Sequence, residues 1–376
     1  MNLCDLRGPA RALCVFSVGL AALAGCHGEN DWEPLATQKI YVADRFYDLA
    51  LLSPEEAVII GYRGKILHTN DSGMTWNDID AGTDNALYNI GFADEKRGWI
   101  VGQESMVLRS EDGGQTWTDQ KADIYMGDDC RESGGEGISE GECQFAPLFA
   151  LSVIDANTAV AVGDRSTVAQ TSDGGRTWSA YTLKPEGLDE LDLNSLLAFE
   201  DPVLYDVQFF DAQNGFIVGE FGKIFKTTDG GKTWVEKQGS LVGDKYFDVL
   251  DLPTFFDVEF LNRNVGYVVG LEARIALTTD GGETWAWAEH GVDEYKAPFY
   301  SASILPSGEV WVVGASGQLA HSPDGKNFGR GTLGTQVNNW IREVQFFDKD
   351  HGWVVGGFGF IMNTSDGGKT WFRRIG

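Results

Sequence analysis

The chain has 376 residues, of which 43% are hydrophobic and 48 are glycines, a composition typical of a folded, turn-rich protein and not of a disordered one. Its formal net charge of −27 makes nucleic acid a poor partner and disfavours adsorption to an anionic membrane surface. The acidity fits either a solubility role or a basic protein partner, and charge alone does not decide between them.

The first 26 residues indicate an export signal. Arg7 and Arg11 precede the apolar run 12–24, which is too short to span a bilayer. The run ends in Leu-Ala-Gly-Cys26, which resembles the lipobox of bacterial lipoproteins and implies acylation of Cys26. The alternative is an ordinary secretory signal with a chance cysteine. We expect a signal peptide at 1–25, a lipidated linker at 26–40 and the folded domain at 41–376.

The remaining cysteines predict a disulfide. Cys4 and Cys14 leave with the signal, so only Cys130 and Cys143 remain beside the acylated Cys26. An even pair in an exported protein is expected to be oxidised. The spacing is not that of a redox or zinc motif.

One motif, Thr/Ser-x-Asp-x-Gly-x-Thr-Trp, recurs in six full copies, and a seventh copy ending at Phe328 is shortened. Its aspartate can accept hydrogen bonds from the backbone of its own turn, which makes these Asp-box residues structural. They are Asp71, Asp112, Asp173, Asp229, Asp280, Asp324 and Asp366.

Each copy belongs to a unit of four short alternating strands of about 50 residues, which is typical of a propeller blade. We therefore predict an all-β fold, a seven-bladed β-propeller of four-stranded blades with Asp-box turns. Either segment 31–34 or segment 371–374 could supply the outer strand of the last blade.

Three connections between an outer strand and the next inner strand are long, at about 119–147, 180–203 and 236–254. Connections of one type emerge on one face of a propeller, so these insertions predict a functional face. The alternative is that the loops have lengthened without a function, since surface loops tolerate insertions. The turns between second and third strands open on that face. The residues predicted to bind a partner are Tyr62, Arg63, Arg165, Phe221, Trp340, Arg342 and Phe358.

Aromatic residues stand in register at the start of six inner strands, and Arg342 takes this position in the seventh. They could form a binding ring, but packing between blades is the favoured interpretation. The six are Tyr47, Tyr88, Phe149, Tyr205, Phe256 and Tyr300.

Signatures of catalysis are missing from the sequence. The Phe/Tyr-Arg-Ile-Pro start of sialidases, a complete phosphate loop and nucleophile motifs do not occur, and the five histidines are scattered. We therefore expect no catalytic residue, no metal and no cofactor.

Repeats of the form 218–234, with the lipobox and a single seven-bladed ring, resemble the photosystem II stability/assembly factor family. The resemblance implies a non-enzymatic factor that binds newly made membrane protein through an arginine-lined surface, to which Arg63, Arg165 and Arg342 would contribute. The acidic insertions differ from such a surface.

The expected role is a lipid-anchored scaffold for a membrane protein or complex in the cell envelope, on the periplasmic side or, in a photosynthetic host, the thylakoid lumen side. The alternatives are an accessory subunit of an envelope transporter, a glycan-binding surface protein, and an Asp-box glycosidase.

Overall fold

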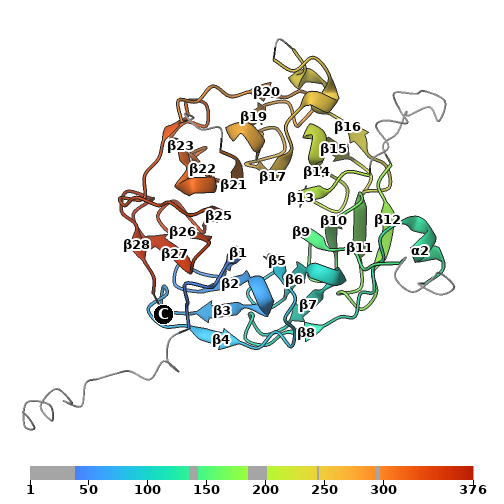
Figure 1. Cartoon of the computed structure of the whole chain (residues 1–376), viewed down its shortest axis with the longest axis horizontal. Coiled ribbons are helices and arrows are strands. Elements are labelled where there is room, and N and C mark those ends of the chain that lie inside the picture. Colours follow the sequence, from blue (N-terminus) through green and yellow to red (C-terminus); the bar gives the residue numbers. More distant parts are fainter. Residues whose placement is uncertain (1–38, 135–142, 185–200, 244, 293–296, 376) are drawn as a thin grey trace, which may run out of the picture. The chain divides into compact units, whose positions relative to one another are not determined.

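Seven four-stranded antiparallel sheets stand in a ring around a central axis, each contributing its first strand to the centre (Figure 1). This computed structural model describes residues 39–134, 143–184, 201–243, 245–292 and 297–375. The ring belongs to the unit Ile40–Gly376. The predicted all-β, seven-bladed propeller is confirmed.

Every blade takes four strands that are consecutive in the chain. Blades one and two contain β1 (Phe46–Leu51), β2 (Ala57–Gly61), β3 (Ile66–Thr69), β4 (Asn77–Ile79), β5 (Leu87–Phe92), β6 (Gly98–Gly102), β7 (Val107–Ser110) and β8 (Thr118–Asp119). Blades three and four contain β9 (Leu148–Val153), β10 (Ala159–Gly163), β11 (Thr167–Thr171), β12 (Ser179–Thr182), β13 (Leu204–Phe209), β14 (Gly215–Gly219), β15 (Ile224–Thr227) and β16 (Val235–Glu236).

The remaining three blades follow the same order. They contain β17 (Phe255–Phe260), β18 (Gly266–Gly270), β19 (Ile275–Thr278), β20 (Ala286–Trp287), β21 (Phe299–Ile304), β22 (Val310–Gly314), β23 (Leu319–Ser322), β24 (Gly329–Arg330), β25 (Ile341–Phe346), β26 (Gly352–Gly356), β27 (Phe360–Thr364) and β28 (Phe372–Arg373). A short helix, α2 (Asp128–Glu132), lies outside the blades. No helix in the described ranges is both long and apolar enough to cross a membrane.

The ring closes by contacts between the last blade and the first. The outer strand of the last blade is β28, within segment 371–374, whereas 31–34 lies outside the described residues. The Leu51 amide donates to Gln345 Oε1 at 3.0 Å, and Asn363 Nδ2 donates to the Ser72 carbonyl at 3.1 Å. Side chains therefore join blades that no shared strand connects.

Each Asp-box turn is held by its own side chains. In blade four, Asp229 accepts bonds from the Thr233 amide at 3.0 Å and from the hydroxyls of Thr233 and Thr227, both at 2.8 Å. These bonds favour the ionised carboxylate, and the bond from the Thr233 amide leads in lowering the pKa of Asp229 to about 2. The lone pairs of this aspartate are thus used inside its own turn.

The other Asp-box aspartates make the same kind of contacts with the hydroxyl two residues before them. In the shortened copy, Asn327 replaces the threonine and donates to Asp324 at 2.7 Å. The remaining members of the set are Asp71, Asp112, Asp173, Asp280 and Asp366.

The aromatic residue that ends the Asp box packs against the second strand of the preceding blade. Trp285 of blade five lies edge-on to Phe216 of blade four, with ring centroids 6.3 Å apart. Trp76 of blade one meets Trp353 of blade seven in the same way at 5.9 Å, and Phe328 of blade six meets Tyr267 at 6.1 Å. These rings are buried, and they couple each of these blades to its neighbour.

We predict that Trp285→Ala lowers the free energy of unfolding by about 3–5 kcal/mol, because it leaves a cavity between two blades. Trp285→Phe should cost about 1.5 kcal/mol or less, since phenylalanine serves naturally in blade six and the indole Nε1 has no partner in the described structure. Denaturant unfolding measures both.

Phe372→Ala, at a ring that is 52% exposed, is the control and should stay within about 0.5 kcal/mol of the wild type. Equal losses for Trp285→Ala and Phe372→Ala would contradict the role given to the Asp-box aromatic ring.

Candidate functional site

The three long connections and the turns between second and third strands meet on one face of the ring. The Ser105 amide donates to the Ala146 carbonyl at 2.8 Å, and the Ser166 amide donates to the Pro202 carbonyl at 2.9 Å. Each bond joins one of these turns to a long connection. We call this side the insertion face. Segments 135–142 and 185–200 and residue 244 of these connections lie outside the described residues.

The turns of the insertion face hold non-glycine residues in the left-handed backbone region. The φ angles of Arg63, Arg165, Phe221 and Phe358 are 58°, 47°, 55° and 60°. Glycine would adopt this conformation with less strain, so the side chains are kept at a cost in backbone energy. Arg63, Arg165 and Phe358 are exposed and Phe221 is half-buried.

Helix α2 is fastened to blade three. The structure joins Cys130 of α2 and Cys143 in a disulfide that closes a sequence separation of 13 residues. Arg131 donates to Thr182 Oγ1 and Thr167 Oγ1, each at 2.9 Å. The first insertion is therefore held both by a covalent bond and by a largely buried arginine.

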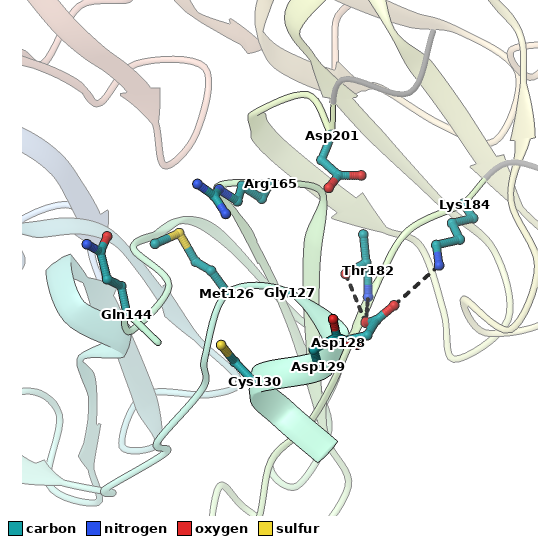
Figure 2. A pocket seen from close by; sticks show the side chains of 10 residues that line it. All are labelled: Met126, Gly127, Asp128, Asp129, Cys130, Gln144, Arg165, Thr182, Lys184 and Asp201. Carbon is teal, nitrogen blue, oxygen red and sulfur yellow. Dashed lines mark hydrogen bonds and ion pairs between the residues drawn. The ribbon is translucent and has the colours of Figure 1, made fainter. Parts of the chain in front are cut away.

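A cavity of about 560 Å³ lies beside α2 on the insertion face (Figure 2). Asp128 accepts bonds from Thr182 Oγ1 at 2.9 Å and from Lys184 Nζ at 3.4 Å. Arg165 and Asp201 lie across the cavity from the helix (Figure 2). Burial leads in raising the pKa of Asp201, with Lys184 opposing it. These charges of both signs suit a polar chain segment as ligand.

Six aromatic side chains form a continuous arc around the channel mouth, here called the aromatic crown. Ring centroids of successive members are 5.0–5.8 Å apart. Each member sits in a bulge at the start of its inner strand and is half-buried. The rings therefore pack between blades, as favoured from the sequence, and also line the mouth. The members are Tyr47, Tyr88, Phe149, Tyr205, Phe256 and Tyr300.

Blade seven closes the crown with two of the predicted partner-binding residues. The Arg342 guanidinium lies 5.5 Å from the centre of the Tyr300 ring, and its Nη1 donates to the Tyr300 carbonyl at 3.1 Å. Trp340 stacks on Tyr47 with centroids 6.0 Å apart. These two residues thus join one surface with the crown.

The other predicted partner-binding residues share the insertion face but are spread around it. Tyr62 lies under the Arg45 guanidinium, which is 5.4 Å from its ring centre. Arg63 lies in a turn of blade one, Arg165 in a turn of blade three and Arg342 in the inner strand of blade seven. They do not form a single arginine cluster.

Carboxylates inside the channel, which the sequence did not single out, surround a cavity of about 400 Å³. Burial raises the pKa of Asp48 to about 7 and that of Glu259 to about 8, and it also raises those of Asp206, Asp257 and Glu343. Their sequence signal is their position, one or three residues after the crown residue of an inner strand or, for Glu343, after Arg342.

These carboxylates also connect blades. The amides of Ile90, Val258 and Ala302 donate to Asp48, Asp206 and Asp257 of the preceding blade at 2.8–2.9 Å. The arrangement fits a structural role. Within the described ranges, no group of three or more His, Cys, Asp or Glu side chains is arranged to hold a metal ion.

Residues 27–121, 196–252 and 244–338 match the family model described as "Photosynthesis system II assembly factor YCF48". The chain belongs to this family. The resemblance inferred from the repeats and the lipobox is confirmed at the level of the family.

Relatives found by sequence similarity carry names that agree with this family. The chain is 25% identical over 314 residues to the photosystem II assembly lipoprotein Ycf48 of Trichormus variabilis, covering 77% of this chain and 87% of the relative. Ycf48 of Thermosynechococcus vestitus is 23% identical over 269 residues, covering 61% and 72%. The chloroplast factor HCF136 of Arabidopsis thaliana is 22% identical over 298 residues, covering 63% and 72%.

Solved structures share the fold. The structure described as "YCF48 bound to D1 peptide" superposes with a TM-score of 0.62 at 17% identity, covering 88% of this chain and 95% of that one. A GH74 enzyme of Niastella koreensis gives 0.60 at 14% identity, covering 88% and 54%. At such identities the likeness shows the propeller fold and no activity.

The channel carboxylates predict how stability depends on pH. The pKa of Glu259 is about 8 in the fold and near 4.5 in an unfolded chain, so its contribution is complete below pH 4.5 and is lost as pH rises toward 8. The Asp-box carboxylates have a pKa near 2 in the fold, so their contribution to stability is present above about pH 4 and is lost only as the pH falls below that value. The melting temperature should therefore be a few degrees higher at about pH 5.5 than at about pH 8.5.

Glu259→Gln should reduce this difference by raising the melting temperature at the higher pH, because the amide stays neutral. Glu289→Gln, at an exposed position, is the control and should leave the profile unchanged. A wild-type melting temperature that is highest at about pH 8.5 would contradict the assignment.

Proposed function

We propose that this chain is a non-enzymatic, lipid-anchored factor that binds a membrane protein through its insertion face and assists the assembly of a membrane complex. The observation that carries the proposal is the gathering of long connections, strained outward residues and the aromatic crown on one face. Membership of the assembly-factor family supports it.

The partner we propose is a photosystem II subunit or its newly made precursor. Support comes from the relatives, which are named photosystem II assembly factors, and from a structure of similar fold described as bound to a D1 peptide. The likeness to that structure covers 88% of this chain.

The chemistry of the insertion face suits a peptide segment that carries both apolar and charged groups. The crown offers half-buried aromatic rings, Phe358 is 58% exposed, and Arg165 borders a polar cavity. Aromatic and arginine side chains dominate the binding energy of protein interfaces. The repeated turn has a residue at positive φ in every blade, and in blades one, three, four and seven this residue is an arginine or a phenylalanine.

A glycosidase is the alternative that the fold leaves open, since a GH74 enzyme shares the ring. Glycosidases need two carboxylates free to act across a bond. Both oxygens of Asp48 accept protein hydrogen bonds, and Asp206 and Asp257 also bond to the next blade. These engagements favour a structural role over a catalytic one. No observation favours a transporter subunit or a glycan binder over an assembly factor.

Cys26 lies outside the described residues, and its acylation remains part of the proposal. Relatives from Picosynechococcus and Prochlorococcus marinus are named lipoproteins, which supports it. The anchor would hold the propeller on the exported side of a membrane, which is the periplasmic side or the thylakoid lumen.

We predict that Cys26→Ala moves the protein from the membrane fraction to the soluble fraction, because two or more acyl chains are needed for stable anchoring. Salt-washed membranes and immunoblotting measure the distribution. Cys130→Ser, which removes a different cysteine, should leave it membrane-bound. A Cys26→Ala protein that stays with salt-washed membranes contradicts the anchor.

We also predict that a crosslinking pull-down from detergent-solubilised native membranes recovers one membrane complex. Replacing Arg63, Arg165 and Arg342 by alanine should reduce recovery by about tenfold or more, as expected for loss of interface arginines. Because Arg342 contacts Tyr300 of the crown, its removal can disturb the fold. The double variant Arg63→Ala and Arg165→Ala keeps Arg342 and should still weaken recovery of the complex.

The matched control removes three cations from the opposite face, through Lys96→Ala, Lys232→Ala and Lys369→Ala. It should recover the complex as the wild type does. An equal loss in this control, or recovery of the free propeller alone by the wild type, would argue against the insertion face as the docking surface.

A further inference from the structure

A crevice between blades two and three lies on the side of the ring opposite the insertion face, here called the Asp-box face. Its cavity of about 450 Å³ is lined by Arg97, Arg109 and Arg176. Arg97 comes from the turn between β5 and β6, Arg109 from β7 and Arg176 from the Asp box of blade three. Three arginines converge there in a protein whose net charge is −27.

Arg109 is buried and incompletely satisfied. Its side chain is 7% exposed, and its guanidinium stacks on Trp99 at 3.6 Å from the ring centre. Nε donates to Glu111 at 2.9 Å and Nη2 donates to the Ala156 carbonyl at 3.1 Å. Nη1 is buried without a hydrogen-bond partner in the described structure. A buried guanidinium N–H without an acceptor is costly, so the charge of Arg109, which lines the crevice, would be stabilised by a counterion there.

The equivalent position in another blade shows how the positive charge of such a side chain can be paired within the protein. In blade four, Lys226 takes the place of Arg109, and its Nζ lies 2.6 Å from Glu283 in the Asp box of blade five. Glu283 occupies the Asp-box position that Arg176 occupies in blade three. An ion pair across the crevice between blades four and five is therefore replaced by two arginines between blades two and three.

The acids beside this crevice leave Arg176 without an ion pair among the described residues. Glu111 pairs with Arg109 but is 68% exposed, so solvent screens the pair. Asp173 accepts bonds from the Thr177 amide at 3.0 Å and from the Thr177 hydroxyl at 2.7 Å, inside its own turn. Arg97 donates through Nε to Asp94 at 2.7 Å, at the solvent edge. In the part of the chain that the structure describes, Arg176 has no acid across from it as Lys226 has.

We propose that this crevice binds a tetrahedral oxyanion, phosphate or sulfate, free or as part of a small ester. Guanidinium groups bind such oxyanions through paired N–H donors. Arginines that reach the cavity from three separate elements match the several oxygens of a tetrahedral anion better than the two coplanar oxygens of a carboxylate. The site is independent of the proposed function, because it lies on the other face of the ring.

Calorimetric titration of the full chain with inorganic phosphate, at constant ionic strength against chloride, tests the proposal. Wild-type protein should bind with a stoichiometry of one. Arg176→Ala should weaken binding by about tenfold or more, as loss of a charge-assisted hydrogen bond implies. Lys232→Ala changes the same Asp-box position in the next blade and should bind as the wild type does.

Arg176→Glu recreates the arrangement of Lys226 and Glu283 and is the sharper variant. It should abolish phosphate binding and raise the melting temperature in phosphate-free buffer, because the new carboxylate pairs with Arg109. This variant leaves the buried Arg109 in place, so loss of binding is not confused with loss of the fold.

Inorganic sulfate and glycerol phosphate are the comparison ligands. Tighter binding of glycerol phosphate than of inorganic phosphate would identify an ester as the ligand, and equal or weaker binding would identify the free ion. The proposal is overturned if the wild type shows no binding beyond chloride, if Lys232→Ala loses as much affinity as Arg176→Ala, or if Arg176→Glu binds as the wild type does.

Discussion

The structure depends on the contact between an Asp-box aromatic ring and the second strand of the preceding blade. Asp229 and its equivalents accept hydrogen bonds from hydroxyl and amide groups of their own turn. The turn held in this way positions the aromatic ring that follows it. In blade five that ring is Trp285, buried edge-on against Phe216. Because successive blades meet through such side chains and not through shared strands, the repeated turn makes seven separate sheets one ring.

This constraint divides the two faces of the ring. On the Asp-box face the turns are held by their own aspartates and have little freedom to change. On the insertion face the connections carry no such motif, so they can lengthen and hold strained residues such as Arg165 and Phe358 without disturbing the contacts between blades. A docking surface on that face and a small-ligand crevice on the other are consistent with this division.

The repeat made the fold predictable, whereas contacts between repeats were not. Seven Asp boxes and the strand alternation predicted the blades, and the order of connections predicted the insertion face. The sequence left ring closure open, because 31–34 and 371–374 both read as short aromatic strands. The channel carboxylates can be located by their position after the start of an inner strand, but the sequence does not reveal that Asp206 and Glu259 are buried together in the channel. Arg109 and Arg176 meet only through the register between neighbouring blades, which sequence spacing does not reveal.

The most direct test of the central claim, that the insertion face docks a membrane protein, is a map of lysine crosslinks between this chain and its partner in native membranes. The account predicts crosslinks from Lys121, Lys184 and Lys245, which lie on the insertion face. Crosslinks concentrated at Lys96, Lys232 and Lys369 on the Asp-box face would contradict it.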